Sequence, residues 1–140
     1  MSADLSLAIG DRGLPYFTLA FAITQIVEVP IYVRALRGAE SRTWRRRALI
    51  GFGASLSTHP IVWFVMPWAA MFLYERALRL GCPTLDVTGR TWLYGAVAEG
   101  FAVIAEALYL KAFRATRPLL WSLFANAASV VVGTIVVRLL

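Results

Sequence analysis

Four long apolar runs constrain this chain more than any other feature of its sequence. A helix needs about 20 predominantly apolar residues to cross the hydrocarbon of a bilayer, and each run is about that long or longer. The runs cover approximately residues 14–33, 48–74, 91–110 and 119–137, with no Ser/Gly-rich linker between them. They predict an all-α, polytopic integral membrane protein, with residues 1–140 forming a single transmembrane domain, a four-helix bundle.

The charge content agrees with this reading. Only 16% of the residues are charged, whereas soluble domains carry about a quarter. The net charge is +6, but the basic residues gather between the apolar runs, where they act as topology signals. We therefore expect a protein that contacts the lipid bilayer and does not bind nucleic acid.

Lysine and arginine divide unequally between the two sides of the predicted bundle. The loops after the first and third runs hold nine of the 14, namely Arg34, Arg37, Arg42, Arg45, Arg46, Arg47, Lys111, Arg114 and Arg117. The opposite side holds Arg12, Arg76, Arg79, Arg90 and Arg138. The positive-inside rule then predicts cytoplasmic basic loops and both termini outside, with a bacterial inner membrane as the expected location.

The densest basic stretch is "RTWRRR" at residues 42–47. Clustered arginines next to a membrane span attract anionic lipid headgroups. We expect Arg42, Arg45, Arg46 and Arg47 to contact anionic lipid, with a specific protein partner as the alternative.

Two stretches of the chain resemble each other: "IVEVPIYVRALR", residues 26–37, and "IAEALYLKAFR", residues 104–114. Glu28 aligns with Glu106, and after a gap of one residue Tyr32 aligns with Tyr109. The spans that follow align more weakly, with Ser55 over Asn126 and Thr58 over Ser129. The pattern predicts two helical hairpins that form a parallel repeat about an axis along the membrane normal. The alternative is the general similarity of apolar spans.

Ionisable side chains inside spans are rare and costly, and by default they indicate function. This chain places Glu28, His59, Glu99 and Glu106 there. Residues three, four or seven apart share one helix face, and on that spacing each span has a single polar stripe that we expect to face inward. The predicted proton or ligand site comprises Glu28, His59, Glu106, Asn126, Gln25 and Glu99.

The two repeat-related glutamates would then face each other across the bundle. Two buried carboxylates cannot easily both ionise, so one holds a proton, or a cation or a histidinium neutralises the pair. Pro30, Pro60 and Pro67 each free the carbonyl four residues earlier, and freed carbonyls near these depths add further cation ligands. A structural alternative has the glutamates bridging to Arg34, Lys111 or a partner's arginine. On that view His59 only packs, Asn126 links helices, and Glu99 meets water.

Three classes of function remain open. The first is translocation of a proton, a cation or a small solute, carried out by a single chain or by a homo-oligomer. The second is a non-catalytic subunit whose buried charges specify assembly with a membrane partner. The third is a metal-dependent intramembrane enzyme acting on a lipid or isoprenoid, with Glu28, His59 and Glu106 as ligands. The chain lacks the common catalytic and nucleotide-binding motifs, and it has one histidine and one cysteine, so the enzyme reading is the weakest and no cofactor or catalytic residue is assigned.

Overall fold

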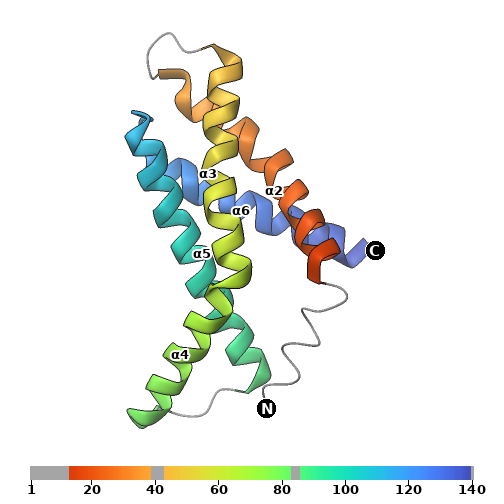
Figure 1. The fold of residues 1–140 in the computed structure, drawn as a ribbon, viewed down its shortest axis with the longest axis vertical. Helices are drawn as coiled ribbons and strands as arrows, with labels where there is room; N and C mark the ends of the chain where they lie inside the picture. Colours follow the sequence, from red (N-terminus) through yellow and green to blue (C-terminus); the bar gives the residue numbers. More distant parts are fainter. Residues whose placement is uncertain (1–12, 39–42, 83–85, 140) are drawn as a thin grey trace.

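The computed structural model describes residues 13–38, 43–82 and 86–139, and every element within those ranges is helical (Figure 1). In chain order the elements are α2 (Gly13–Ala35), the 3-10 turn η1 (Leu36–Gly38), α3 (Trp44–Phe64), α4 (Met66–Arg79), α5 (Val87–Ala112) and α6 (Pro118–Leu139). The all-α prediction is therefore confirmed for the described residues. Arg12 and Arg42 lie outside them.

Three of the four predicted spans correspond to single helices. α2, α5 and α6 are each long and apolar enough to cross a membrane. They contain the runs predicted at residues 14–33, 91–110 and 119–137. The bent pair α3–α4 adds a fourth span if the two helices are counted together.

The second predicted run, residues 48–74, is not one continuous helix. The chain bends by 51° between α3 and α4, at Val65. Pro67 lies in the first turn of α4, and because proline has no N–H, the carbonyl of Trp63 loses its usual donor. The hydroxyl of Tyr94 in α5 donates to the neighbouring carbonyl of Val62, 3.1 Å away. Apolar length alone therefore located this run, which lies within residues 44–79, but missed its break.

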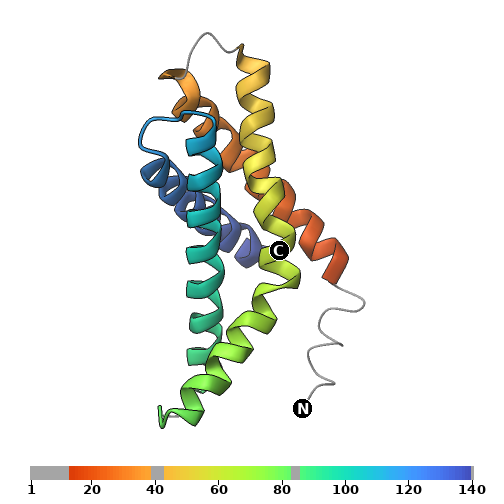
Figure 2. The same cartoon turned by 60° about the vertical axis from the view of Figure 1, so that its left-hand side comes forward.

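The long helices contact one another in a ring. α2 packs on α3 and α6, α5 packs on the same two helices, and α4 packs on α3 and α5. Figures 1 and 2 show that the end of α2, the start of α3 and the α5–α6 connection lie at the same end of the molecule. We call this the basic end, defined by Arg34, Arg37, Arg45, Arg46, Arg47, Lys111, Arg114 and Arg117. The start of α2 and the end of α6 lie away from it, and we call them the far end.

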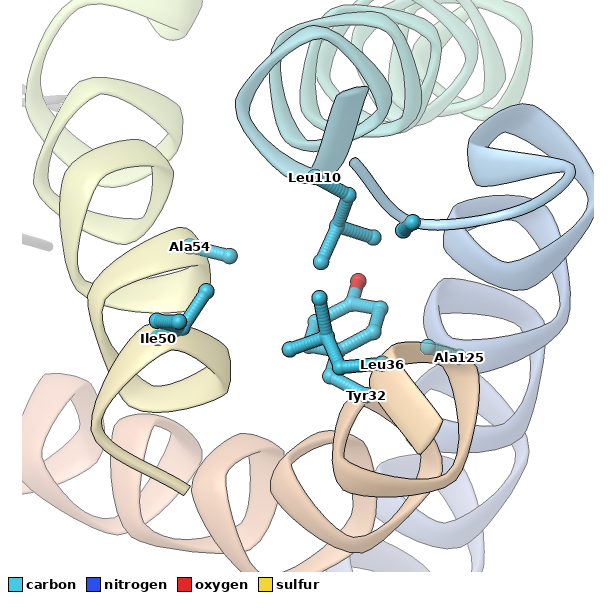
Figure 3. Packing of buried hydrophobic residues seen from close by; sticks show 7 residues of the cluster. Tyr32, Leu36, Ile50, Ala54, Leu110 and Ala125 are labelled. Atoms are coloured by element: carbon cyan, nitrogen blue, oxygen red, sulfur yellow. The ribbon is translucent and has the colours of Figure 1, made fainter. Parts of the chain in front are cut away.

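A hydrophobic cluster fills the interior next to the basic end (Figure 3). Its buried members are Tyr32, Leu36, Ile50, Ala54, Leu110, Ala115 and Ala125. These residues come from the last turns of α2 and α5, the 3-10 turn, the first half of α3, the α5–α6 connection and the first half of α6. The cluster therefore closes the space between the helices at this end.

Away from this cluster, the distribution of side chains is inverted relative to a soluble bundle. The buried polar side chains are Glu28, Ser55, Thr58, His59, Glu106, Ser122 and Asn126. Large apolar side chains point outward instead, among them Ile26 (74% exposed) and Leu49 (71% exposed). A polar interior inside an apolar surface is the arrangement expected of helices surrounded by lipid, where polar residues face the bundle interior.

The α5–α6 connection is a tight helix ending that holds these two helices as a hairpin. Ala115 donates its backbone N–H to the Leu110 carbonyl (3.0 Å), and Arg114 donates to Lys111 (2.9 Å). This is the Schellman pattern, which usually has glycine at its left-handed position. Here Arg114 occupies that position with φ of 60°, and Pro118 then begins α6.

Candidate functional site

Two buried glutamates lie at the centre of the ring of helices. Glu28 comes from the middle of α2 and is 1% exposed, and Glu106 comes from α5 and is 2% exposed. Glu28 lies six residues before Arg34, about 9 Å along the helix axis at 1.5 Å per residue. The two carboxylates are linked through neighbouring residues of α6, because Asn126 donates to Glu106 and Ser129 donates to Glu28. Neither faces the outer surface, so the sequence-based expectation of inward-facing polar stripes agrees with the geometry of these two residues.

Glu106 accepts hydrogen bonds from three other helices. The hydroxyl of Tyr32 in α2 donates to Oε2, and the side-chain amide of Asn126 in α6 donates to the same oxygen at 2.6 Å. The hydroxyl of Thr58 in α3 donates to Oε1 at 2.7 Å. Ser122 lies 3.5 Å from Oε2, although its hydroxyl is closer to the carbonyl of Val103, at 2.9 Å. Glu106 thereby joins α2, α3 and α6 to α5.

Glu28 accepts two hydrogen bonds, both from serine hydroxyls. Ser55 in α3 donates to Oε2 at 2.6 Å, and Ser129 in α6 donates to Oε1 at 2.8 Å. The Ser129 hydroxyl also lies 3.0 Å from the carbonyl of Asn126. Since one hydroxyl has one proton, Ser129 has a second acceptor within reach if Glu28 takes up another partner.

The donors to the two glutamates come from corresponding positions. Each glutamate accepts one bond from the other helix of its own hairpin, Ser55 for Glu28 and Asn126 for Glu106. Each also accepts one bond from the opposite hairpin, through Ser129 and Thr58 respectively.

The two tyrosines break this correspondence. Tyr32 is fully buried and donates to Glu106. Tyr109 is half-buried, its ring packs against Phe113 with 5.0 Å between centroids, and its hydroxyl lies so close to Gly53 that a Cβ there would be 2.5 Å away.

The structural alternative of ion pairs receives no support from the described residues. The described donors to Glu28 and Glu106 are all hydroxyl or amide groups. The bridges to Arg34 or Lys111 that the sequence suggested as an alternative are not formed. The glutamates are therefore solvated by hydroxyl and amide groups rather than by basic side chains.

A cavity of about 530 Å³ adjoins the glutamates and extends away from the basic end. Its lining includes Glu28 and Glu106 at its inner part and Tyr16 and Arg138 toward the far end. The other lining residues are Leu19, Ala20, Ile23, Thr24, Thr58, His59, Val62, Trp63, Glu99, Ala102, Asn126, Ser129, Val130, Gly133 and Thr134. The hydrophobic cluster lies on the opposite side of the glutamates, so the cavity ends at the carboxylates.

His59 lines the same cavity but does not bond to either glutamate. Its ring packs against Phe17 and Phe21, with centroids 5.3 and 5.1 Å away, and against Trp63 at 6.1 Å. Its Nε2 is buried and has no hydrogen-bond partner. The predicted Glu28–His59–Glu106 group therefore shares one cavity, with His59 on an aromatic wall apart from the carboxylate network.

The remaining predicted site residues have different positions. Asn126 is 6% exposed and bonds directly to Glu106. Glu99 is half-buried, lines the cavity, and is two helical turns from Glu106 on α5. Gln25 is not among the lining residues, and both polar atoms of its side chain are buried without a partner.

Sequence reasoning left several donors out of the site. Tyr32, Ser55, Thr58, Ser122 and Ser129 all contact a glutamate carboxylate. A signal was available, because these residues lie on the same helix faces as the predicted ones and all five carry a hydroxyl group within an apolar span. Which hydroxyl donates to which glutamate depends on how the helices are rotated against each other.

A metal centre is not formed by the described part of the chain. No group of three or more His, Cys, Asp or Glu side chains is gathered in the geometry of a metal site there. This gives no support to the metal-dependent enzyme alternative. Comparisons with protein-family models, with curated proteins and with solved structures found no match to this chain.

Proposed function

We propose that this chain is an integral membrane protein that translocates a proton, a cation or a small solute through the cavity that ends at Glu28 and Glu106. One observation carries the proposal: two buried carboxylates, with no basic partner among the described residues, lie at the inner end of a cavity. Buried charges without partners are costly. Exchangeable protons or cations are the simplest way to neutralise such a pair.

The proposed orientation follows from the basic end. If that end faces the cytoplasm, as the positive-inside rule predicts, the cavity opens toward the outside and the hydrophobic cluster closes the cytoplasmic side. Translocation then needs a second conformation in which Tyr32 and Leu36 separate from the cluster and expose the carboxylates to the cytoplasm. The proposed contact of Arg45, Arg46 and Arg47 with anionic lipid belongs to this orientation.

The two hairpins are proposed to be a parallel repeat. The matched donors support this, since Ser55 and Asn126 serve the glutamate of their own hairpin while Thr58 and Ser129 serve the other one. Pseudo-symmetric halves around a central site are a common way to build alternating access in transporters. Superposing α2–α3 on α5–α6, with Glu28 over Glu106, tests the relationship.

The subunit alternative predicts a different interior. Buried charges that only specify assembly are expected to be sealed in pairs, or to lie at a face that a partner covers. Here the carboxylates line a cavity large enough for a small molecule, and this is why translocation is favoured over assembly.

Flux into proteoliposomes tests the proposed function. A pH-sensitive dye inside the vesicles reports protein-dependent movement of protons. The assay is run without an added solute and then with sodium, potassium or the small organic amine 2-phenylethylamine on one side of the membrane. We expect a protein-dependent flux that falls at least about tenfold in Glu28→Gln and Glu106→Gln, because the amide keeps the shape but cannot exchange a proton. Glu75→Gln, an exposed carboxylate on α4 outside the cavity, is the matched control.

Thermal unfolding of the same variants separates function from folding. Gln variants that unfold like the wild-type protein but transport nothing support the proposal. Absence of flux for every probe in the wild-type protein contradicts it. So does a loss of flux that only tracks a loss of stability.

A further inference from the structure

We propose that the cavity binds an organic ammonium ion, a protonated amine with an apolar body, through Glu28 and His59. The inference rests on the proposed function in one respect: it names the class of solute that enters the cavity. Three observations carry it, namely the balance of hydrogen-bond donors and acceptors, the unpartnered Nε2 of His59, and the size and walls of the cavity.

The carboxylates at the inner part of the cavity are hydrogen-bond acceptors. The donors next to them are already engaged in hydrogen bonds. The donors Tyr32, Thr58 and Asn126 point at Glu106, and Ser55 and Ser129 point at Glu28. An ionised carboxylate offers about four lone-pair positions. Glu28 accepts two hydrogen bonds and so retains acceptor capacity toward the cavity that it lines. A ligand that fits this surface must bring donors.

His59 adds an independent requirement for a donor. The side chain is 9% exposed, it lines the cavity, and its Nε2 has no partner. In the neutral tautomer that carries its proton on Nδ1, Nε2 is an acceptor with an unused lone pair. Buried acceptors of this kind are normally satisfied, and an ammonium N–H satisfies it.

The volume and walls select an organic cation over a metal ion. About 530 Å³ lies within the range of roughly 300–1,000 Å³ typical of small-molecule sites, far larger than an alkali ion needs. The walls include Ile23, Val62 and Val130, and the indole of Trp63 lies beside His59. An aromatic face next to carboxylates stabilises a cation with apolar substituents. Arg138, the basic residue in the described lining, belongs to the far end, away from the carboxylates.

Binding of three matched probes to the purified protein in nanodiscs tests the inference. The probes are 2-phenylethylamine, its N,N,N-trimethyl derivative, which keeps the charge but has no N–H, and 2-phenylethanol, which has no charge. Isothermal titration calorimetry, corrected with empty nanodiscs, gives each dissociation constant. We expect the amine to bind at least about tenfold more tightly than either analogue, because it alone combines charge with several donors.

Variants locate the binding. Glu28→Gln should weaken amine binding about tenfold or more, while Glu75→Gln should leave it unchanged. His59→Phe should weaken the amine but not the trimethyl derivative, because only the amine can donate to Nε2. If His59→Phe does not fold, the comparison of amine with trimethyl derivative on the wild-type protein decides the role of the donors.

Several results would overturn the inference. Equal affinity for all three probes would show that the site does not require a charged donor. Unchanged binding in Glu28→Gln would place any bound amine elsewhere, and displacement of the amine by millimolar sodium or potassium would assign the site to an inorganic cation. The outcome is separable from the proposed function: amine binding without any flux contradicts translocation alone, and proton flux without amine binding contradicts this inference alone.

Discussion

Glu28 and Glu106 occupy corresponding positions in the two hairpins, yet their surroundings differ. Glu106 accepts bonds from a tyrosine, a threonine and an asparagine on three different helices. Glu28 accepts bonds from two serines. An asparagine amide keeps a donor directed at its partner, whereas a serine hydroxyl can rotate to a neighbouring carbonyl. Glu106 is therefore held in place, and Glu28 is free to exchange partners.

This difference suggests a division of labour between two residues that align in the sequence. Glu106 cross-links the bundle next to the hydrophobic cluster, through Tyr32. Glu28 has fewer donors and lines the cavity that His59, with its buried and unpartnered Nε2, also lines. In this interpretation both carboxylates exchange protons, Glu106 in addition maintains the closed conformation, and Glu28 is the residue at which a proton or a cation arrives first.

The largest expected effect comes from removing each carboxylate. Glu106→Leu should lower the free energy of unfolding by about 2 kcal/mol or more, because it leaves the Tyr32 hydroxyl and one Asn126 N–H without their acceptor, each costing about 1–3 kcal/mol. Thr58 loses less, since its hydroxyl has the Ser55 carbonyl 3.2 Å away. Glu28→Leu should cost about 1 kcal/mol or less, since Ser129 has the Asn126 carbonyl within reach and a buried charge is removed. Chemical unfolding in detergent measures both. Equal losses for the two variants would refute the division of labour.

A smaller effect is expected from removing the hydroxyl of Tyr32 or Tyr109, two residues that align in the similar stretches of sequence. Tyr32→Phe removes the hydroxyl that donates to Glu106 and should lower stability by about 1–2 kcal/mol. Tyr109→Phe is the matched control and should cost less than about 0.5 kcal/mol, as its hydroxyl does not donate to a glutamate. Flux in Tyr32→Phe is the second readout. If the Tyr32 bond holds the closed conformation, the variant should lose stability without losing flux.

The smallest effect distinguishes a close donor to Glu106 from a distant one. Thr58→Val keeps the side-chain shape but removes a donor at 2.7 Å, and should cost about 1 kcal/mol. Ser122→Ala removes a hydroxyl that is 3.5 Å from the carboxylate and nearer to a backbone carbonyl, and should cost about 0.5 kcal/mol or less. Differential thermal unfolding compares them. A larger loss for Ser122→Ala would mean that the network around Glu106 is arranged differently.

The primary sequence by itself determined the helical class, the approximate positions of α2, α5 and α6, and the burial of the two glutamates. These properties depend on local quantities: the length of an apolar run, and the spacing of polar residues around a helix. The same local pattern identified His59, Glu99 and Asn126 as inward-facing. The sequence also aligned Ser55 with Asn126 and Thr58 with Ser129. Each of these four side chains donates a hydrogen bond to a glutamate.

Only the tertiary structure decided which side chain donates to which carboxylate, where the second apolar run bends, and in which direction the cavity extends. Tyr32 bonds to Glu106, 74 residues away, rather than to Glu28 on its own helix. The bend at Val65 depends on Pro67 together with the packing of α4 against α5. The cavity ends at the glutamates because side chains from all four long helices fill the space at the basic end. Each of these outcomes depends on the rotation and crossing of whole helices, which are set by many side chains acting together, and no single segment of the sequence contains that information.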